Sequence, residues 1–312
     1  MRNLLVAALL AAFAASVGAQ GQKSTYKVPR TPDGQPDFQG YWTNLTYTPY
    51  ERPKELANKP FYTEKEAIEA FNKAVAESEN QVVHYVNTDF GATPVQTGAK
   101  PNLRTSLVID PPDGRIPPMT PEAQKREAAR TAAQRAGGPL ARTWRDDRGT
   151  VWCVFHERAV PAVTAPYGSN YHIVQSKNSI VMIYEWNSER RVISLDQPHG
   201  TVPLYAGDSR GHWEGDTLVV DTVNFSSKSS FRGAHENLHL VERFTRVSPD
   251  RLEYSFTVSD DTTWTRPWTA MIPLQRSRAP MYEYACHEGN LGLAGILSGT
   301  RAEERESKEA AQ

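Results

Sequence analysis

The sequence predicts a mainly β protein: an antiparallel lipocalin-like barrel, or else a strongly twisted sheet, with a proline-rich N-terminal arm and two or three helices. Three observations predict this fold class. Apolar residues recur with period two from residue 150 onward, turn residues separate the short segments that they form, and 13 of the 22 prolines lie in residues 20–121. About eight short strands in a row, joined by tight turns, are typical of an antiparallel meander that closes into a barrel.

The expected strands belong to a β domain over residues 150–300. Two of them flank the turn Lys177-Asn178-Ser179 and predict a hairpin, and Gly215-Asp216 predicts a tight turn within or before another. Strict alternation indicates that one face of several strands is wet or lines a cavity. The expected strands are Tyr171–Val174, Ile180–Tyr184, Arg191–Leu195, Trp213–Asp221, Leu238–Val247, Leu252–Val258, Trp264–Pro273 and Met281–Cys286.

Residues 20–149 are expected to form an arm that packs on the β domain. Proline fixes φ and lacks a backbone donor, so a hydrogen-bonded ladder does not run through such a stretch. Two helices are expected within the arm: one over 63–79, begun by a capping box of Thr63 and Glu66, and one from Pro121 to Arg135. Residues 301–312 predict a charged, solvated C-terminal tail.

Residues 1–19 have the pattern of a cleavable secretory signal peptide. Arg2 precedes an apolar stretch over Leu4–Ala15, and the small residues Val17-Gly18-Ala19 follow it. The apolar stretch is shorter than the roughly 20 residues that a membrane-spanning helix needs, so an uncleaved anchor is the less favoured alternative. We therefore expect a periplasmic or secreted protein without membrane insertion after cleavage.

Charge and cysteine content narrow the classes of partner. The 35 basic and 36 acidic residues nearly cancel, so there is no electrostatic case for nucleic-acid binding, and no motif indicates a cofactor. The chain has two cysteines, Cys153 and Cys286. An exported chain meets an oxidising compartment, so a disulfide between them is predicted, and two unrelated buried thiols are the alternative. The sequence does not indicate an oligomeric state.

A candidate catalytic site follows from a pattern that recurs beside both cysteines. If the two cysteines form a disulfide, their Cα atoms lie about 5.5–6 Å apart. The His-Glu pairs that follow the two cysteines then lie close to each other in space. A histidine beside a carboxylate suits general acid–base catalysis, and an arginine there would bind an anionic group. A histidine that opens the next strand would line the same cavity. The residues are His156, Glu157, Arg158, His172, His287 and Glu288.

Two alternatives remain open for these residues. In the first, they are polar groups that hydrogen-bond one another around a structural disulfide. Cysteine and histidine are also zinc ligands, so Cys153, His156, Cys286 and His287 form a second, less favoured set.

The pattern His235-Glu236-x-x-His239 matches the zinc-peptidase motif, which requires a helix so that both histidines share one face. Gly233 lies just before the motif, and the residues from Leu238 onward alternate as a strand. On a strand the two histidines lie roughly 13 Å apart, too far for one metal ion. A loop that leads into a strand is therefore the favoured interpretation.

Four long motifs resemble a family of uncharacterised exported bacterial proteins found in soil and marine Gram-negatives. They are Pro32–Asp37, Gly207–Thr222, Thr263–Thr269 and Tyr282–Asn290. The resemblance extends over nearly the whole mature chain. It implies a periplasmic or secreted setting, and it carries over no catalytic residue.

These observations lead to three functional hypotheses. The first is an exported enzyme that acts on a small organic molecule by general acid–base chemistry without a cofactor, as a lyase, hydrolase or isomerase. In it His287 or His156 moves the proton, Glu288 or Glu157 orients the histidine, and Arg158 binds an anionic group. The second is a non-catalytic periplasmic small-molecule binding protein with the same pocket. The third is a zinc hydrolase that uses His235 and His239.

Overall fold

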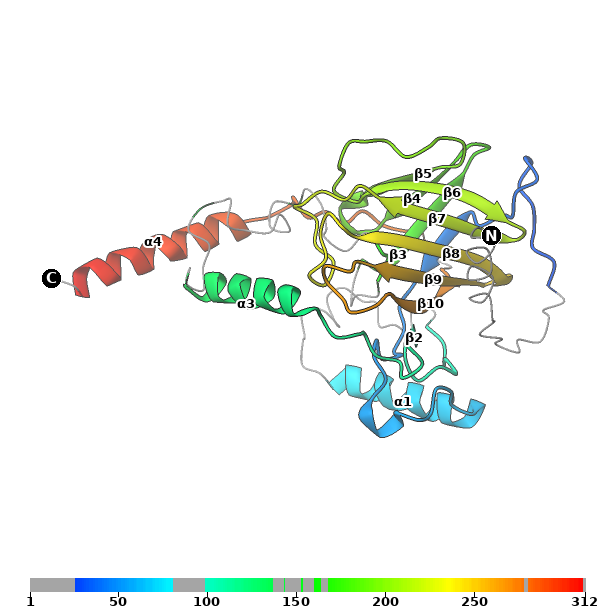
Figure 1. Cartoon of the computed structure of the whole chain (residues 1–312), viewed down its shortest axis with the longest axis horizontal. Helices are drawn as coiled ribbons and strands as arrows, with labels where there is room; N and C mark the ends of the chain where they lie inside the picture. The colour runs from blue at the N-terminus through cyan, green and yellow to red at the C-terminus, as the bar shows by residue number, and fades with distance from the viewer. Residues whose placement is uncertain are drawn as a thin grey trace, which may run out of the picture.

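The computed structural model describes residues 26–80, 99–136, 143, 153, 160–163, 168–277 and 280–310. Within them a single ten-stranded sheet dominates (Figure 1). Nine strands close into a barrel because β1 pairs with both β3 and β10, and β2 is attached outside, along β10. The strands are β1 (Gly40–Thr43), β2 (Val108–Asp110), β3 (Asn170–Gln175), β4 (Ser179–Tyr184), β5 (Arg190–Ser194), β6 (Asp208–Glu214), β7 (Thr217–Val223), β8 (His239–Ser248), β9 (Arg251–Ser259) and β10 (Trp268–Arg276).

The predicted fold class is confirmed, with three corrections to the elements. β5 and β6 run parallel, because the connection between them returns to the end of the barrel from which β5 started. The proline-rich arm supplies the strands β1 and β2. Met281–Cys286 forms no strand: most of its side chains are exposed or half-exposed, and no sheet partner lies beside it.

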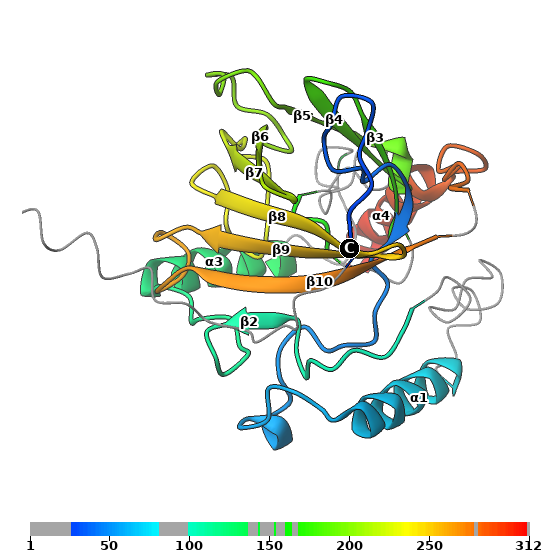
Figure 2. The same cartoon turned by 90° about the vertical axis from the view of Figure 1, so that its right-hand side faces the viewer.

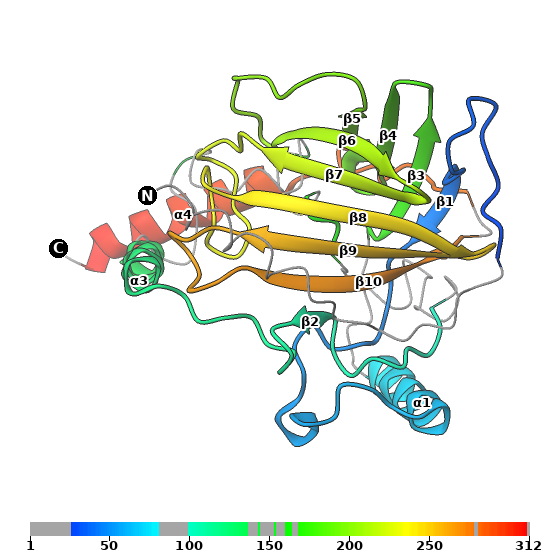
Figure 3. The same cartoon turned by 45° about the vertical axis from the view of Figure 1, so that its right-hand side comes forward.

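Three α-helices flank the barrel: α1 (Glu64–Asn80), α3 (Pro121–Ala136) and α4 (Gly292–Ala310). The capping box is present, since the Glu66 carboxylate accepts from the Thr63 N–H and hydroxyl. Hydrogen bonds from Lys59 and Thr63 lower the pKa of Glu66 to about 2. Figures 1 and 3 show α1 below β2, on the side of β2 that faces away from β10, and α3 and α4 beyond one end of the barrel. Among the described residues, none of these helices is long and apolar enough to cross a membrane.

Alternating residues fill the barrel as the sequence predicts. Leu252, Tyr254, Phe256 and Val258 on β9 are fully buried. They face Leu274, Ile272, Ala270 and Trp268 of β10 in register, and these side chains are buried as well. Each large apolar side chain that leaves water contributes about 1.5–3 kcal/mol. The interior is therefore packed with side chains rather than empty.

The end of the barrel that carries the β3–β4, β6–β7 and β8–β9 turns, here the turn end, is closed by the N-terminal segment. Phe38 is buried there, and its ring contacts Trp213 edge-on at 5.2 Å between centroids. The Phe38 N–H donates to Gln175 Oε1 at 2.5 Å, and Trp42 Nε1 donates to the Phe38 carbonyl at 2.8 Å. Figure 2 shows this segment crossing the strands near β1 and β3. The N-terminal segment therefore packs over the apolar interior at the turn end.

A buried ion pair spans the middle of the barrel. The Arg191 guanidinium contacts both carboxylate oxygens of Glu242, and the two side chains are 3% and 0% exposed. Arg191 also donates to Ser209 and Thr222 at 2.9 Å. Tyr254 Oη donates to Glu242 at 2.7 Å, and burial raises the pKa of this phenol well above its ordinary value. These two charged side chains are tolerated in the buried interior because each has several hydrogen-bond partners.

The network continues to the opposite end, here the loop end, where the longer connections gather. The Ala162 N–H donates to Tyr254 Oη at 3.1 Å, and Asn44 Nδ2 donates to the Ala162 carbonyl at 2.9 Å. The backbone N–H and the backbone carbonyl of Ala162 are thus both hydrogen-bonded to side chains inside the barrel. Ala162 consequently lies inside the loop end of the barrel, where it is 1% exposed.

We predict that Arg191→Leu lowers the free energy of unfolding by about 3–5 kcal/mol, because it leaves the Glu242 charge buried without a partner. The matched control is Arg243→Leu on the outer face of β8. Arg243 pairs with Glu214 at 2.6 Å, but both side chains are almost half exposed, so a loss below about 1 kcal/mol is expected. Urea unfolding of both variants measures the difference. Equal losses would contradict the stabilising role of the buried pair.

Candidate functional site at the loop end of the barrel

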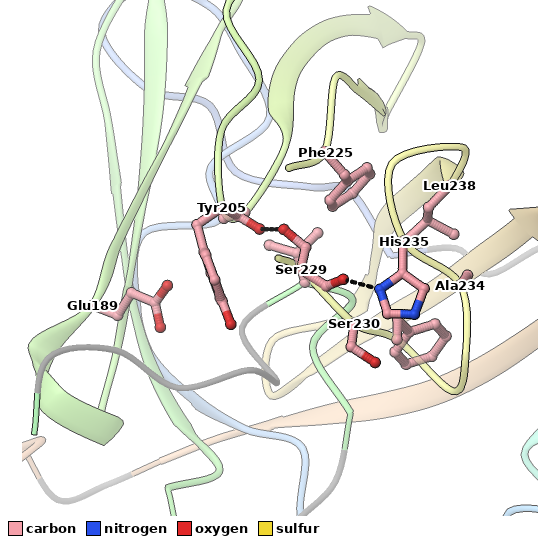
Figure 4. Close-up of a pocket in the computed structure, with 11 residues that line it drawn as sticks. Glu189, Tyr205, Phe225, Ser229, Ser230, Ala234, His235 and Leu238 are labelled. Atoms are coloured by element: carbon pink, nitrogen blue, oxygen red, sulfur yellow. Dashed lines mark hydrogen bonds between the residues drawn. The ribbon is translucent and has the colours of Figure 1, made fainter. Parts of the chain in front are cut away.

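A pocket opens at the loop end, between the β4–β5 turn and the connections that precede β6 and β8 (Figure 4). Its volume is ≈ 20 Å³, little more than the about 10–15 Å³ that one ordered water needs. Polar groups line one part of it and aromatic and aliphatic groups the other. The lining residues are Val160, Glu189, Tyr205, Ala206, Phe225, Ser229, Ser230, Phe231, Ala234, His235 and Leu238.

A two-residue turn positions the histidine of this pocket. Phe231 and Ala234 exchange backbone hydrogen bonds at 2.9 and 3.0 Å, around Arg232 and Gly233. Both central residues have positive φ (51° and 91°), the geometry of a type I′ turn, which glycine adopts without steric cost. The turn places His235 at the rim of the pocket, with Ser229 and Ser230 on the other side (Figure 4).

The hydrogen bond of His235 fixes its tautomer. Nδ1 lies 2.6 Å from the Ser229 carbonyl oxygen. A carbonyl oxygen only accepts, so Nδ1 carries the proton in the neutral ring and Nε2 keeps the lone pair. Among the described residues, no group hydrogen-bonds Nε2.

A chain of histidines and carboxylates anchors the connection that carries Tyr205. His199 bridges two carboxylates: Nδ1 is 3.3 Å from Asp208 and Nε2 is 2.9 Å from Asp221. The second oxygen of Asp221 contacts His239 Nε2 at 2.6 Å. The Ser229 hydroxyl then donates to the Tyr205 carbonyl at 2.5 Å, which joins this connection to the one before β8. The pocket wall is therefore held by the bond between Tyr205 and Ser229 and by the ion pairs of His199 outside the pocket.

The predicted disulfide is present at the same end of the barrel. The Sγ atoms of Cys153 and Cys286 are bonded, and the two Cα atoms lie 5.5 Å apart. Two residues before Cys286, Tyr284 stacks on Trp186 of the β4–β5 turn with centroids 5.0 Å apart. Glu189, which lines the pocket, donates its backbone N–H to the Trp186 carbonyl. The disulfide and the pocket thus share the β4–β5 turn.

The residues of the predicted catalytic site do not all come together beside the disulfide. His287 and Glu288 are exposed on the turn that follows Cys286. His156, Glu157 and Arg158 lie outside the residues that the structure describes.

The expectation that His172 lines the cavity is wrong. His172 stacks on Tyr41 at 4.3 Å, and on β3 it alternates with the buried Tyr171 and Ile173, so it lies on the outer face.

The zinc-peptidase pattern lacks the geometry that it requires. His235 lies in the connection before β8, Glu236 is in a turn, and His239 is the first residue of β8. The two histidines bind different partners, the Ser229 carbonyl and the Asp221 carboxylate. In the described part of the chain, no three metal-ligating side chains converge. The favoured interpretation, a loop that leads into a strand, is confirmed.

Sequence reasoning missed most of the pocket. Glu189, Tyr205 and Ser230 come from separate connections, and no local pattern links them. Gly233 is the signal that was available: it indicated a turn just before His235, and that turn presents the histidine to the pocket.

Comparisons with known proteins leave the function open. No protein-family model matches the chain, and no curated protein matches it. A crystal structure of an alanine mutant of the fluorescent protein UnaG is similar, with 12% identity and a TM-score of 0.25 over 39% of this chain and 86% of that chain. A similarity at this level carries no argument about function.

We predict that reduction of the disulfide lowers stability. The bond closes a loop with a sequence separation of 133, and in the chain-entropy model a loop of this length contributes about 4–5 kcal/mol at most. Paired Cys153→Ser and Cys286→Ser substitutions are expected to lower the urea midpoint. In the wild type, mass spectrometry after alkylation without reductant is expected to find no modified thiol. Complete alkylation under these conditions would contradict the bond.

Proposed function

We propose that the protein binds a small organic molecule at the loop end of its barrel, with the polar end of the molecule inserted between His235, Ser230 and Glu189. The observation that carries this proposal is the convergence of polar side chains from three connections on a pocket with an aromatic wall. Pockets of this composition, a few placed polar groups against apolar side chains, are typical of small-molecule sites.

The size of the pocket limits what enters it. A volume of ≈ 20 Å³ admits a group no larger than a water molecule, such as a hydroxyl, an amine or one carboxyl oxygen. The remainder of the ligand therefore lies outside the pocket, at its rim. His235 Nε2 accepts a hydrogen bond, which favours ligands that end in a donor.

We expect His235→Ala to weaken binding about tenfold, the effect of one lost hydrogen bond of roughly 1–1.5 kcal/mol. The probes are a panel of small alcohols, amines and carboxylic acids, screened by ligand-observed NMR and quantified by calorimetry. The control is His212→Ala, since His212 is exposed on β6 and pairs only with Glu214 at 3.2 Å. Binding that His235→Ala leaves unchanged would contradict this site.

A second candidate function is catalysis by the same histidine. The Ser229 carbonyl holds the Nδ1–H tautomer, so Nε2 is available as a general base, the arrangement that acid–base catalysis requires. The earlier hypothesis, a site built from His156, Glu157, Arg158, His287 and Glu288, is supported by the bond between the cysteines that precede the two pairs. Both versions describe an exported enzyme without a cofactor.

Two variants distinguish these versions. Turnover of a panel of esters, lactones and hydroxy acids is compared for wild type, His235→Ala and His287→Ala. Loss of a general base costs about 10²–10⁴-fold in rate. A loss confined to His235→Ala assigns the base to the pocket, and a loss confined to His287→Ala assigns it to the cysteine-linked pair. Binding without turnover of any panel member leaves the protein as a binding protein.

We also propose that the chain is exported and that residues 1–19 are removed. The disulfide supports this proposal, because such bonds persist in oxidising compartments. The resemblance to exported bacterial proteins points in the same direction. Mass spectrometry of the protein purified from a bacterial periplasm is expected to find Gln20 at the N-terminus.

A further inference from the structure

A second, larger cavity lies outside the barrel, within the proline-rich arm, between α1 and the segments of the arm that precede and follow this helix. Its volume is ≈ 290 Å³, and every residue that lines it comes from the N-terminal arm. We refer to it as the α1 groove. The lining residues are Tyr47, Thr48, Pro49, Pro53, Tyr62, Ala67, Ala70, Phe71, Lys73, Ala74, Glu77, Lys100, Asn102 and Arg104.

The groove is hollow because of the residues on one face of α1. Ala67, Ala70 and Ala74 follow one another at spacings of three and four, so they share one face of the helix. That face lies against the arm, where Pro49 and Pro53 form the opposite wall. Alanine side chains are too short to reach this wall, and the space between the two surfaces stays open.

The walls of the groove are aromatic. Phe71 contacts Tyr47 edge-on with centroids 5.4 Å apart, and Tyr62 lies on the same cavity. Aromatic rings pack best against other flat rings, in offset-stacked or edge-to-face arrangements. A volume of ≈ 290 Å³ is near the lower limit of the about 300–1,000 Å³ that is typical of ligand pockets. The occupant that fits is a molecule with a single ring.

The charge of the groove is positive. Three basic side chains and one carboxylate line it, and that carboxylate, Glu77, lies 3.8 Å from Lys73. Among the described residues, Lys100 and the guanidinium of Arg104 have no ion pair or hydrogen bond. Burial lowers the pKa of Arg104, because this charge is costly to hold away from water, and the nearby carboxylate of Glu253 offsets only part of the shift. An anion in the groove would offset that cost.

The guanidinium of Arg104 is held in place before any ligand arrives. It lies over the Phe61 ring at 5.1 Å. The backbone beside it is fixed as well: the Arg104 N–H donates to Asn102 Oδ1 at 3.2 Å, and Asn102 Nδ2 donates to Thr48 at 3.1 Å. The Tyr62 N–H donates to the Leu103 carbonyl at 2.7 Å, which joins the two walls. A preorganised cation of this kind binds a carboxylate at low entropic cost.

We propose that the α1 groove is a binding site for a single-ring aromatic carboxylate, whose ring lies between Tyr47, Tyr62 and Phe71 and whose carboxylate pairs with Arg104 and Lys100. The site is separate from the pocket at the loop end of the barrel. It gives the arm a recognition role in addition to its packing role.

Calorimetry of the mature protein with sodium 3-phenylpropanoate tests the proposal. We expect a dissociation constant below about 1 mM for this ligand size. The neutral 3-phenylpropanamide tests the charge and sodium propanoate tests the ring, and each is expected to bind at least about tenfold more weakly. Arg104→Gln is expected to weaken 3-phenylpropanoate binding by a similar factor. Ala74→Leu, which fills the groove, is expected to abolish it.

Two substitutions on the exposed face of α1 serve as matched controls. Lys65→Gln removes a surface charge and Ala76→Leu adds the same bulk on the exposed side of the helix, and neither residue lines the groove. Thermal unfolding verifies that each variant is folded. If Ala74→Leu does not fold, Arg104→Gln and Lys100→Gln carry the test.

Three outcomes would overturn the proposal. They are the absence of binding at about 5 mM ligand, equal binding by Arg104→Gln and Lys65→Gln, and dimerisation through α1 that excludes the ligand. His235→Ala is expected to leave 3-phenylpropanoate binding unchanged. The failure of this site and the failure of the site at the loop end are therefore distinguishable.

Discussion

The structure depends on the closure of the barrel by β1. This strand of four residues pairs with β3 on one side and with β10 on the other, and without it the remaining strands would form an open sheet with two free edges. Free edges expose unpaired N–H and C=O groups. Closure also brings Phe38 and Trp42 to the turn end, where they seal the core. One short segment thus completes the hydrogen-bonded ladder and covers its end.

A closed and filled barrel restricts where a ligand can bind. The ion pair of Arg191 and Glu242 occupies the middle, the N-terminal segment closes the turn end, and Ala162 is bound inside the loop end. Two pockets of the described structure lie at the rim of the loop end and in the α1 groove. Both are built on connections or on the arm. In both proposals the barrel acts as the support and the segments around it carry the recognition chemistry, a division that is common in proteins.

Much of the barrel could be predicted from the sequence, because its strands have a local signature. The alternation in Leu252–Val258 and the turn at Gly215-Asp216 appear in the structure as β9 and as the β6–β7 hairpin. β1 could not be predicted in this way, since Gly40–Thr43 is too short to show a period and lies among prolines. The parallel pairing of β5 and β6 depends on the path of a connection, which periodicity does not report.

The candidate site was harder to predict than the fold. The disulfide followed from composition and compartment, and it is present. The surroundings of His235 depend on Tyr205 and Glu189, which lie far from it in the sequence and meet it only after the barrel has closed. The local pattern around His235 matches the zinc-peptidase motif, whereas in the structure His235 and His239 bind different partners, the Ser229 carbonyl and the Asp221 carboxylate.

The double pairing of β1 also has a consequence for the order of folding. The hydrogen bond from Arg276 to the Gln39 carbonyl joins residues 237 positions apart. Contacts of such high sequence separation form slowly, because the entropy of loop closure is lost before the contact is gained. β1, which lies near the start of the chain, is therefore among the last strands to find its partners. The barrel cannot close until β10, the last strand in the sequence, has been synthesised.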